Sequence, residues 1–188
     1  YYVRALYGRG QRDKALDWTT DLWLSPKSQP KACDPIFDVW RTTPRFNQDI
    51  AWQRLDGAIQ ANQRTLARYL LRFFTGSNKR IAEAYYQVHT QPKRIQRNSR
   101  FSIDNAKTRT AIRHGLIRLS RSAPQEAAGA WQRYAKSHSF GAVQRSVIND
   151  HIQVGLAKDG VFPEDSERGG ASSSFAAQGM AEAALSQQ

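Results

Sequence analysis

The residue types that could perform catalysis are few in this chain, and their spacing brings no catalytic set together. Successive histidines are 25, 24 and 13 residues apart, and they are His89, His114, His138 and His151. None of these spacings is the i, i+4 pattern that places two histidine ligands on one face of a helix. Ser146 lies near His151 in sequence but lacks the flanking glycines of a nucleophile elbow. We therefore expect no catalytic residue and no metal site.

Carboxylates and thiols add no further chemistry. Glycoside cleavage by paired carboxylates needs two acids across a cleft, and none of the five glutamates lies in a recognisable acid motif. Cys33 is the only cysteine, so the chain can form neither an internal disulfide nor a cysteine-based zinc site. We expect no cofactor.

The basic residues are the distinctive chemical group, and two sets of arginines recur at four-residue spacing. Side chains four residues apart lie on one face of a helix. The arginines of the two sets are our candidate substrate-binding residues: Arg64, Arg68 and Arg72, followed by Arg109 and Arg113.

Positive charge is also concentrated along the chain. From Gln91 to Arg121 there are nine bases against Asp104 alone, which is a local charge of +8. One interpretation is a solvated helix face. The other is a surface that attracts an anionic polymer.

The elements that must position these arginines are helices. In residues 64–74 apolar side chains recur at i, i+3, i+4, i+7 and i+8, which is the apolar stripe of an amphipathic helix. Similar patterns run through residues 11–24, 34–40, 48–61, 103–121, 124–138 and 141–158, and Asn78 is a candidate cap for a further helix that ends before Pro92. No segment sustains the period-2 alternation of a strand. The sequence predicts an all-α chain.

The apolar stripes also predict the core. Aromatic side chains on a stripe are more often packed inside than used as ligand platforms. The residues that we expect in the core are Trp18, Trp23, Phe37, Trp40, Trp52, Leu66, Phe73 and Trp131.

Short connections between the helices indicate an array of antiparallel helical hairpins. The tetrapeptide Ala-Trp-Gln-Arg occurs at 51–54 and again at 130–133, which favours a duplicated helical array. We assign residues 1–160 to this array. Residues 161–171 read as a loop, and residues 172–188 as the last helix of a truncated hairpin.

Composition limits the partners rather than the fold. The chain has 188 residues, a net charge of +12 and a pI near 10.3. This charge favours anionic partners. No apolar run is long enough to span a membrane.

One segment carries a specific resemblance. Between Leu22 and Trp40 the chain reads Trp-Leu, then Lys-Ser-Gln-Pro, Ala-Cys-Asp, Phe and Val-Trp. These short segments resemble the N-terminal helical region of soluble lytic murein transglycosylases. Beyond Trp40 the likeness continues as a matching helical layout.

The resemblance implies a fold and a function. The array would be part of a right-handed α-superhelix in a periplasmic enzyme that forms 1,6-anhydromuropeptides from peptidoglycan. In that family a glutamate general acid lies in a Glu-Ser motif, with Gly-Leu-Met-Gln nearby, and neither motif occurs here. The resemblance therefore implies a non-catalytic scaffold that encloses and positions the glycan strand. Its partners would be the glycan strands and the C-terminal helical and catalytic domains, which are absent from this sequence.

Two alternatives come from the charge and the fold class. A basic all-α chain meets the first criterion for a nucleic-acid-binding module, although it lacks a recognition-helix signature, and we expect no specific nucleic acid. An α-helical array is also a common protein-interaction scaffold.

Overall fold

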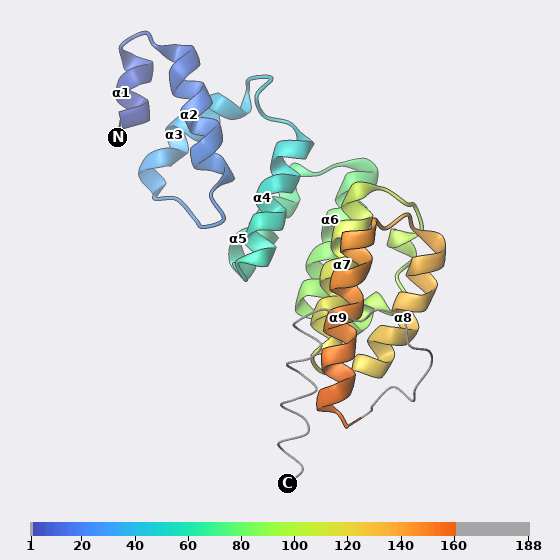
Figure 1. Ribbon diagram of the computed structural model, residues 1–188. Coiled ribbons are helices and arrows are strands. Elements are labelled where there is room, and N and C mark those ends of the chain that lie inside the picture. Colours follow the sequence, from blue (N-terminus) through green and yellow to red (C-terminus); the bar gives the residue numbers. More distant parts are fainter. Residues whose placement is uncertain (1, 161–188) are drawn as a thin grey trace. The chain divides into compact units, whose positions relative to one another are not determined.

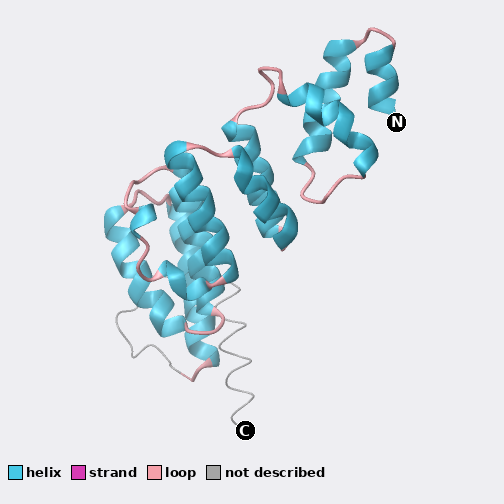
Figure 2. Cartoon of the chain, turned by 180° about the vertical axis from the view of Figure 1, so that it is seen from behind, coloured by secondary structure: helices cyan, strands magenta, loops and turns pink. Residues whose placement is uncertain are grey.

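The computed structural model describes residues 2–160, and within that range every regular element is a helix (Figure 2). The α-helices are α1 (Tyr2–Gly8), α2 (Arg12–Leu24), α3 (Asp34–Arg41), α4 (Gln48–Gln60), α5 (Arg64–Leu70), α6 (Gly76–Thr90), α7 (Ala106–Ser120), α8 (Pro124–Ser137) and α9 (Ala142–Lys158). Four 3₁₀ turns join them: η1 (Lys31–Cys33), η2 (Leu71–Phe73), η3 (Pro92–Ile95) and η4 (Ser99–Phe101). The predicted all-α hairpin array is confirmed. The predicted loop 161–171 and helix 172–188 lie outside the described residues.

The chain divides into two compact units, and the boundary between them falls inside α6, after Tyr86. In the first unit α1 packs on α2, α2 on α3 and α4, and α4 on α5. In the second unit α7, α8 and α9 lie side by side, and each contacts the other two (Figure 1). Short loops produce these neighbours because a connection of a few residues folds one helix back on the previous one.

The core of the first unit is an aromatic cluster around Trp23. The Trp23 ring centroid lies 5.3 Å from those of Phe37 and Trp40, 5.4 Å from that of Phe73 and 5.7 Å from that of Phe46. Trp23, Phe37 and Trp40 are all buried. Most of these rings meet edge to face, which is a favoured geometry for aromatic pairs.

The second unit is built on the apolar stripe of α7. Ile112, Leu116 and Leu119 are completely buried. Polar ends of aromatic side chains tie the other elements to this core. The Trp131 indole donates to Asn149 Oδ1 at 2.6 Å, which joins α8 to α9. The Tyr134 hydroxyl donates to the Ile95 carbonyl at 3.0 Å.

Gly155 allows a close approach between α9 and the start of the α7–α8 connection. A Cβ atom at this position would lie 2.4 Å from the Ser120 carbonyl oxygen and 2.9 Å from Pro124 Cβ. Real Cβ atoms do not approach backbone oxygens that closely. The small residue is therefore required by packing, since only glycine leaves room for the neighbouring backbone.

The predicted helix starts are only partly correct. Asn47 caps α4, since its side chain accepts from the backbone N–H groups of Asp49 and Ile50 at 3.0 Å. Asn78, however, lies inside α6, which begins at Gly76 with a positive φ of 55°. Glycine adopts that left-handed backbone without the steric cost of a side chain.

Of the predicted core residues, Trp18 is wrong and Phe73 is only half-buried. Trp18 is 46% exposed, because α2 turns Ala15, Thr19 and Trp23 inward and leaves position 18 beside α1, where its ring centroid lies 5.1 Å from that of Tyr2. The Phe73 ring lies in the aromatic cluster, 5.4 Å from those of Trp23 and Phe46, but the residue is only half-buried.

The partial exposure of Phe73 follows from the length of α5. The α-helix ends at Leu70 and continues as the tighter turn η2, which changes the angular position of every later side chain. Phe74 becomes the buried ring at 2% exposure, while Tyr69 of the same predicted stripe is 42% exposed.

Candidate functional site

The first set of predicted binding arginines lies on α5 and η2 in the first unit. Arg64, Arg68 and Arg72 are exposed, and none forms an ion pair with an acid of residues 2–160. The three arginines do not lie on one face of a single α-helix, because Arg72 lies in η2 beyond the end of α5. Its guanidinium instead stacks over the Tyr69 ring, 4.8 Å from the centroid.

The second set lies on α7 in the second unit, and its charges are less available. Arg109 forms an ion pair with Asp104, and the two side chains are 25% and 27% exposed. The Asp104 carboxylate also accepts from the Ser139 backbone N–H at 2.8 Å. That hydrogen bond, together with Arg109, lowers the pKa of Asp104. Arg113 is half-buried.

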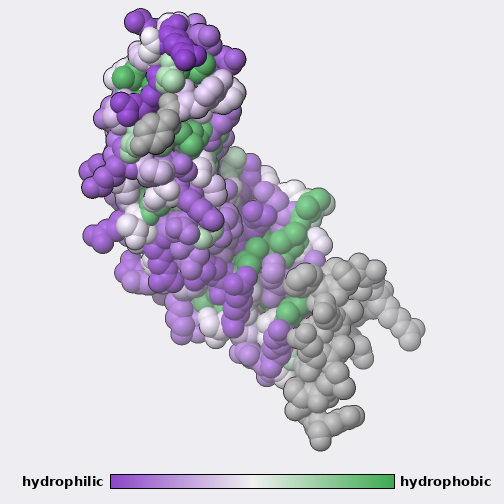
Figure 3. Space-filling view, turned by 90° about the vertical axis from the view of Figure 1, so that its left-hand side faces the viewer, coloured by the Kyte–Doolittle hydropathy of each residue, from purple (hydrophilic) through white to green (hydrophobic). Residues whose placement is uncertain are grey.

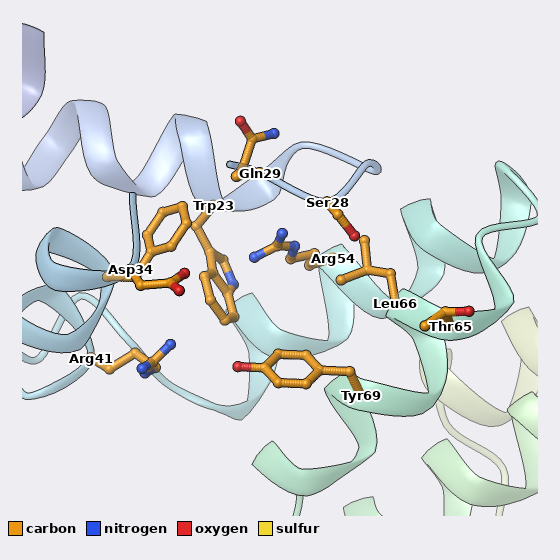
Figure 4. Close-up of a pocket in the computed structure, with 10 residues that line it drawn as sticks. Trp23, Ser28, Gln29, Asp34, Arg41, Arg54, Thr65, Leu66 and Tyr69 are labelled. Atoms are coloured by element: carbon orange, nitrogen blue, oxygen red, sulfur yellow. The ribbon is translucent and has the colours of Figure 1, made fainter. Parts of the chain in front are cut away.

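The first unit also contains a cavity of about 310 Å³ that none of the predicted site residues identified. Side chains of α2, α3, α4 and α5 and of the loop after α2 line it (Figure 4). Trp23, Phe37 and Leu66 form apolar walls, and Tyr69 lies at one side. The volume is at the lower end of the range for small-molecule sites.

Arg54 of α4 is the most deeply buried of the three charged side chains that line this cavity, the others being Asp34 and Arg41. It is 3% exposed, and its guanidinium carbon lies 4.2 Å from the Trp23 ring centroid. Its only hydrogen bond runs from Nη2 to the Lys27 carbonyl at 3.5 Å, and its buried Nε has no partner among the described residues. Burial lowers the pKa of Arg54 to about 10, and repulsion from Arg41 adds to the effect.

A second buried donor faces the same cavity. The indole Nε1 of Trp23 is buried and has no acceptor in the described chain. A buried donor left without an acceptor typically costs about 1–3 kcal/mol. Asp38 pairs with Arg41, and Asp34, which also lines the cavity, lies across the Trp23 ring from Arg54 in Figure 4. The cavity therefore presents two buried hydrogen-bond donors that have no acceptor among the described residues.

Sequence reasoning missed Arg54, although one signal was present. Arg54 lies between Ala51 and Ala58 at helical spacing, on the apolar stripe of α4. A charged residue on such a stripe is rarely buried unless it has a partner. An arginine on the apolar stripe of a helix therefore indicates a buried charge that needs a partner.

Two histidines that are distant in sequence meet in the second unit. His89 Nδ1 lies 3.1 Å from His114 Nε2, and His89 is 1% exposed. Burial lowers the pKa of His114 to about 3, with further contributions from His89 and nearby arginines. Across residues 2–160 no group of three or more potential ligands is arranged to hold a metal ion.

The face of the molecule shown in Figure 3 is predominantly polar, since hydrophilic side chains cover most of it. The exposed large apolar residues include Val143 at 77% and Ile103 at 64%, and Tyr2 and Trp18, whose rings pack on each other. In the described part of the chain, the helices are too short or too polar to cross a bilayer.

Comparison with known proteins connects this geometry to one family by sequence. No family model matches the chain. The soluble lytic murein transglycosylase of Salmonella typhimurium is 31% identical over 94 residues, and that of Escherichia coli K12 is 30% identical over 94 residues. Each match covers 50% of this chain and 15% of the relative. The chain thus matches a minor part of these proteins.

Solved structures agree with the sequence matches. The lytic transglycosylase Slt of Pseudomonas aeruginosa, solved as an inactive mutant, aligns with 84% of this chain and 25% of its own at 30% identity and a TM-score of 0.67. The 70 kDa soluble lytic transglycosylase of Escherichia coli aligns with 98% of this chain and 28% of its own at 21% identity and a TM-score of 0.71. That enzyme has also been solved in complex with bulgecin A. The fold class predicted from the sequence is confirmed.

Proposed function

We propose that this chain is a non-catalytic scaffold. The premise is that it is a helical-domain fragment of a soluble lytic murein transglycosylase. In this proposal it encloses and positions a peptidoglycan strand for a catalytic domain of the same enzyme. The whole enzyme would cleave murein in the periplasm and form 1,6-anhydromuropeptides.

The likeness to the Pseudomonas aeruginosa enzyme is the observation that carries the proposal. At 30% identity and a TM-score of 0.67 over 84% of this chain, sequence and fold agree on the same relative. A binding surface that confines a polymer lowers the entropy cost of presenting it to a reactive site. A scaffold therefore contributes to catalysis without a catalytic residue of its own.

The exposed arginines of the first unit supply the attraction for the polymer. Arg64, Arg68 and Arg72 have no acidic partner in residues 2–160, so their charge is available to the carboxylates of peptide stems. Arg109 and Arg113 belong to the same proposal. The ion pair of Arg109 with Asp104 makes this second set the weaker contributor.

Sedimentation with murein sacculi tests the binding surface. We expect the chain to sediment with sacculi at about 150 mM salt, and less so as salt screens exposed charges. The variant Arg64→Ala/Arg68→Ala/Arg72→Ala should sediment less. A matched control, Arg9→Ala/Lys14→Ala/Lys31→Ala, removes the same charge from exposed positions outside α5 and η2. Equal loss in both variants would reduce the effect to net charge, and no sedimentation of the parent chain would contradict the proposal.

Incubation of the same chain with sacculi tests the non-catalytic role. We expect no release of anhydromuropeptides above a blank preparation, and turnover above it would show a catalytic residue that the proposal lacks. Duplex DNA provides the comparison for the nucleic-acid alternative. Non-specific binding at physiological salt has a Kd of about 10⁻⁴–10⁻⁶ M. Nanomolar, sequence-selective binding at that salt would favour the alternative instead.

A further inference from the structure

The cavity around Arg54 combines two properties that rarely occur together without a ligand. Its two buried donors, Arg54 Nε and Trp23 Nε1, have no acceptor among residues 2–160. Both side chains are nearly completely buried, at 3% and 1% exposure. Protein interiors pair almost all of their buried polar groups, so two unmatched donors on one cavity point to an acceptor that the chain does not supply.

The charge around the cavity defines the chemistry of that acceptor. Arg54 forms no ion pair with an acid of the described chain, whereas Arg41, which also lines the cavity, is paired with Asp38. The carboxylate of Asp34 lines the cavity on the other side of the Trp23 ring and leaves the buried Arg54 charge unpaired (Figure 4). A guanidinium binds planar oxyanions through parallel N–H donors. The indole N–H of Trp23 can donate to the same group. A carboxylate satisfies both donors and neutralises the buried charge.

The walls and the size restrict the rest of the ligand. Trp23, Phe37 and Leu66 contribute apolar surface, and the Gln29 and Thr65 side chains contribute hydrogen-bonding groups at the border. The cavity volume of about 310 Å³ has room for one or two small residues rather than a disaccharide-peptide. These features suit the end of a short peptide with small side chains.

We propose that this cavity binds the terminal carboxylate of a short peptide, with Arg54 and the Trp23 indole N–H as its donors. The identification of that peptide as a stem of peptidoglycan rests on the proposed function. The carboxylate itself rests on the cavity alone. Arg54 then acts as a specificity-determining residue that distinguishes a free peptide end from a cross-linked or amidated one.

Nuclear magnetic resonance on the full chain tests the proposal directly. The five tryptophans give five indole N–H signals, and the Trp23 signal is identified by its loss in Trp23→Phe. The probes are N-acetyl-D-alanyl-D-alanine, its C-terminal carboxamide, and N-acetyl-L-alanyl-L-alanine. We expect a carboxylate probe to shift the Trp23 indole signal downfield in a saturable manner. The carboxamide should bind at least tenfold more weakly. Equal binding of the carboxamide, or no shift with either carboxylate, would overturn the proposal.

Two substitutions separate a binding role of Arg54 from a structural one. Arg54→Met keeps the length of the side chain and removes its charge, and it should weaken the carboxylate probe at least tenfold. Lys14→Met removes one charge from the exposed surface of α2, outside both proposed binding sites, and should change the affinity less than twofold. Because Arg54 is buried without an acidic partner, Arg54→Met should not lower the thermal midpoint of the unliganded chain. Unchanged binding in Arg54→Met would contradict the assignment.

The outcomes distinguish the cavity from the wider function. Dipeptide binding without sedimentation on sacculi would keep the carboxylate site and overturn the scaffold proposal. Sedimentation without dipeptide binding would do the reverse. Preference for the D-alanyl probe indicates a cell-wall peptide, whereas preference for the L-alanyl probe indicates the C-terminus of a protein and contradicts the peptidoglycan source.

Discussion

The buried histidine pair predicts that the second unit loses stability as the pH falls below 7. His114 Nε2 lies 3.1 Å from His89 Nδ1, and the two ring centroids are 5.3 Å apart. Burial is the largest cause of the lowered pKa of His114, which falls to about 3, and His89, Arg118, Arg113 and Arg121 contribute in that order. A proton on His114 would be buried beside cationic neighbours.

The sign and the size of the effect follow from linkage. The unfolded chain protonates His114 near the ordinary pKa of about 6.5, whereas the folded chain does so only near 3. Between these values the unfolded state binds more protons, so stability falls as the pH falls. Each pH unit is worth about 1.4 kcal/mol, so the chain should be about 2 kcal/mol less stable at pH 5 than at pH 7. The pKa of His151 is also lowered, chiefly by burial, and acts in the same direction.

Urea denaturation at pH 7, 6 and 5 measures the prediction. His114→Gln removes the titrating ring, so its stability should depend less on pH than that of the parent chain. Ile112→Val on the same helix provides the control. It loses about 0.5–1.5 kcal/mol by truncation of a buried side chain and should keep the parent pH dependence.

Two results would contradict the lowered pKa of His114. A histidine-ring resonance of His114 that titrates with a midpoint between 6 and 7 in the folded chain would show that the ring accepts a proton readily. An unchanged pH dependence in His114→Gln would lead to the same conclusion. Either result would assign the acid sensitivity to general charge repulsion in this basic chain.

Further predictions concern packing in the two units. Gly155→Ala should lower stability by about 1–3 kcal/mol, because its Cβ would meet the Ser120 carbonyl oxygen. Gly129→Ala, where an added Cβ meets nothing within 4 Å, should instead raise it by about 0.5–1 kcal/mol, as is usual inside a helix. Trp40→Ala should cost about 3–5 kcal/mol, since the ring is fully buried and its indole donates to Thr20 Oγ1 at 2.9 Å. Thermal and urea denaturation check all three, and an unchanged Trp40→Ala midpoint would place that ring outside the core.

Several features of this protein follow from local pattern and are visible in the sequence. The apolar stripes predict the helices, and the start of α8 at Pro124 and its end near residue 138 agree with the structure to within one residue. Helices are readable in this way because their hydrogen bonds and side-chain periodicity are local. The short segments between Leu22 and Trp40 resemble soluble lytic murein transglycosylases, and the comparisons find similarity to the same proteins.

Other features depend on which helix covers which stripe. Trp18 and Trp23 lie on the same helix and look equally apolar in sequence, yet Trp23 is enclosed by α3 and its neighbours and Trp18 is not. Phe73 and Phe74 lie on the same predicted stripe, yet Phe74 is buried and Phe73 only half-buried, because α5 tightens into a 3₁₀ turn after Leu70. The burial of these aromatic residues is therefore determined by neighbouring elements rather than by the apolar pattern of their own segment.

The candidate site depends on tertiary structure most of all. Periodicity identified the exposed arginines of α5, because regular spacing is a local property. It could not identify Arg54, whose role comes from a cavity formed by four helices and a loop. It also could not pair His89 with His114, which are 25 residues apart in sequence and 3.1 Å apart in space. Burial and electrostatic environment are sums over elements that are distant along the chain, so only the folded structure determines them.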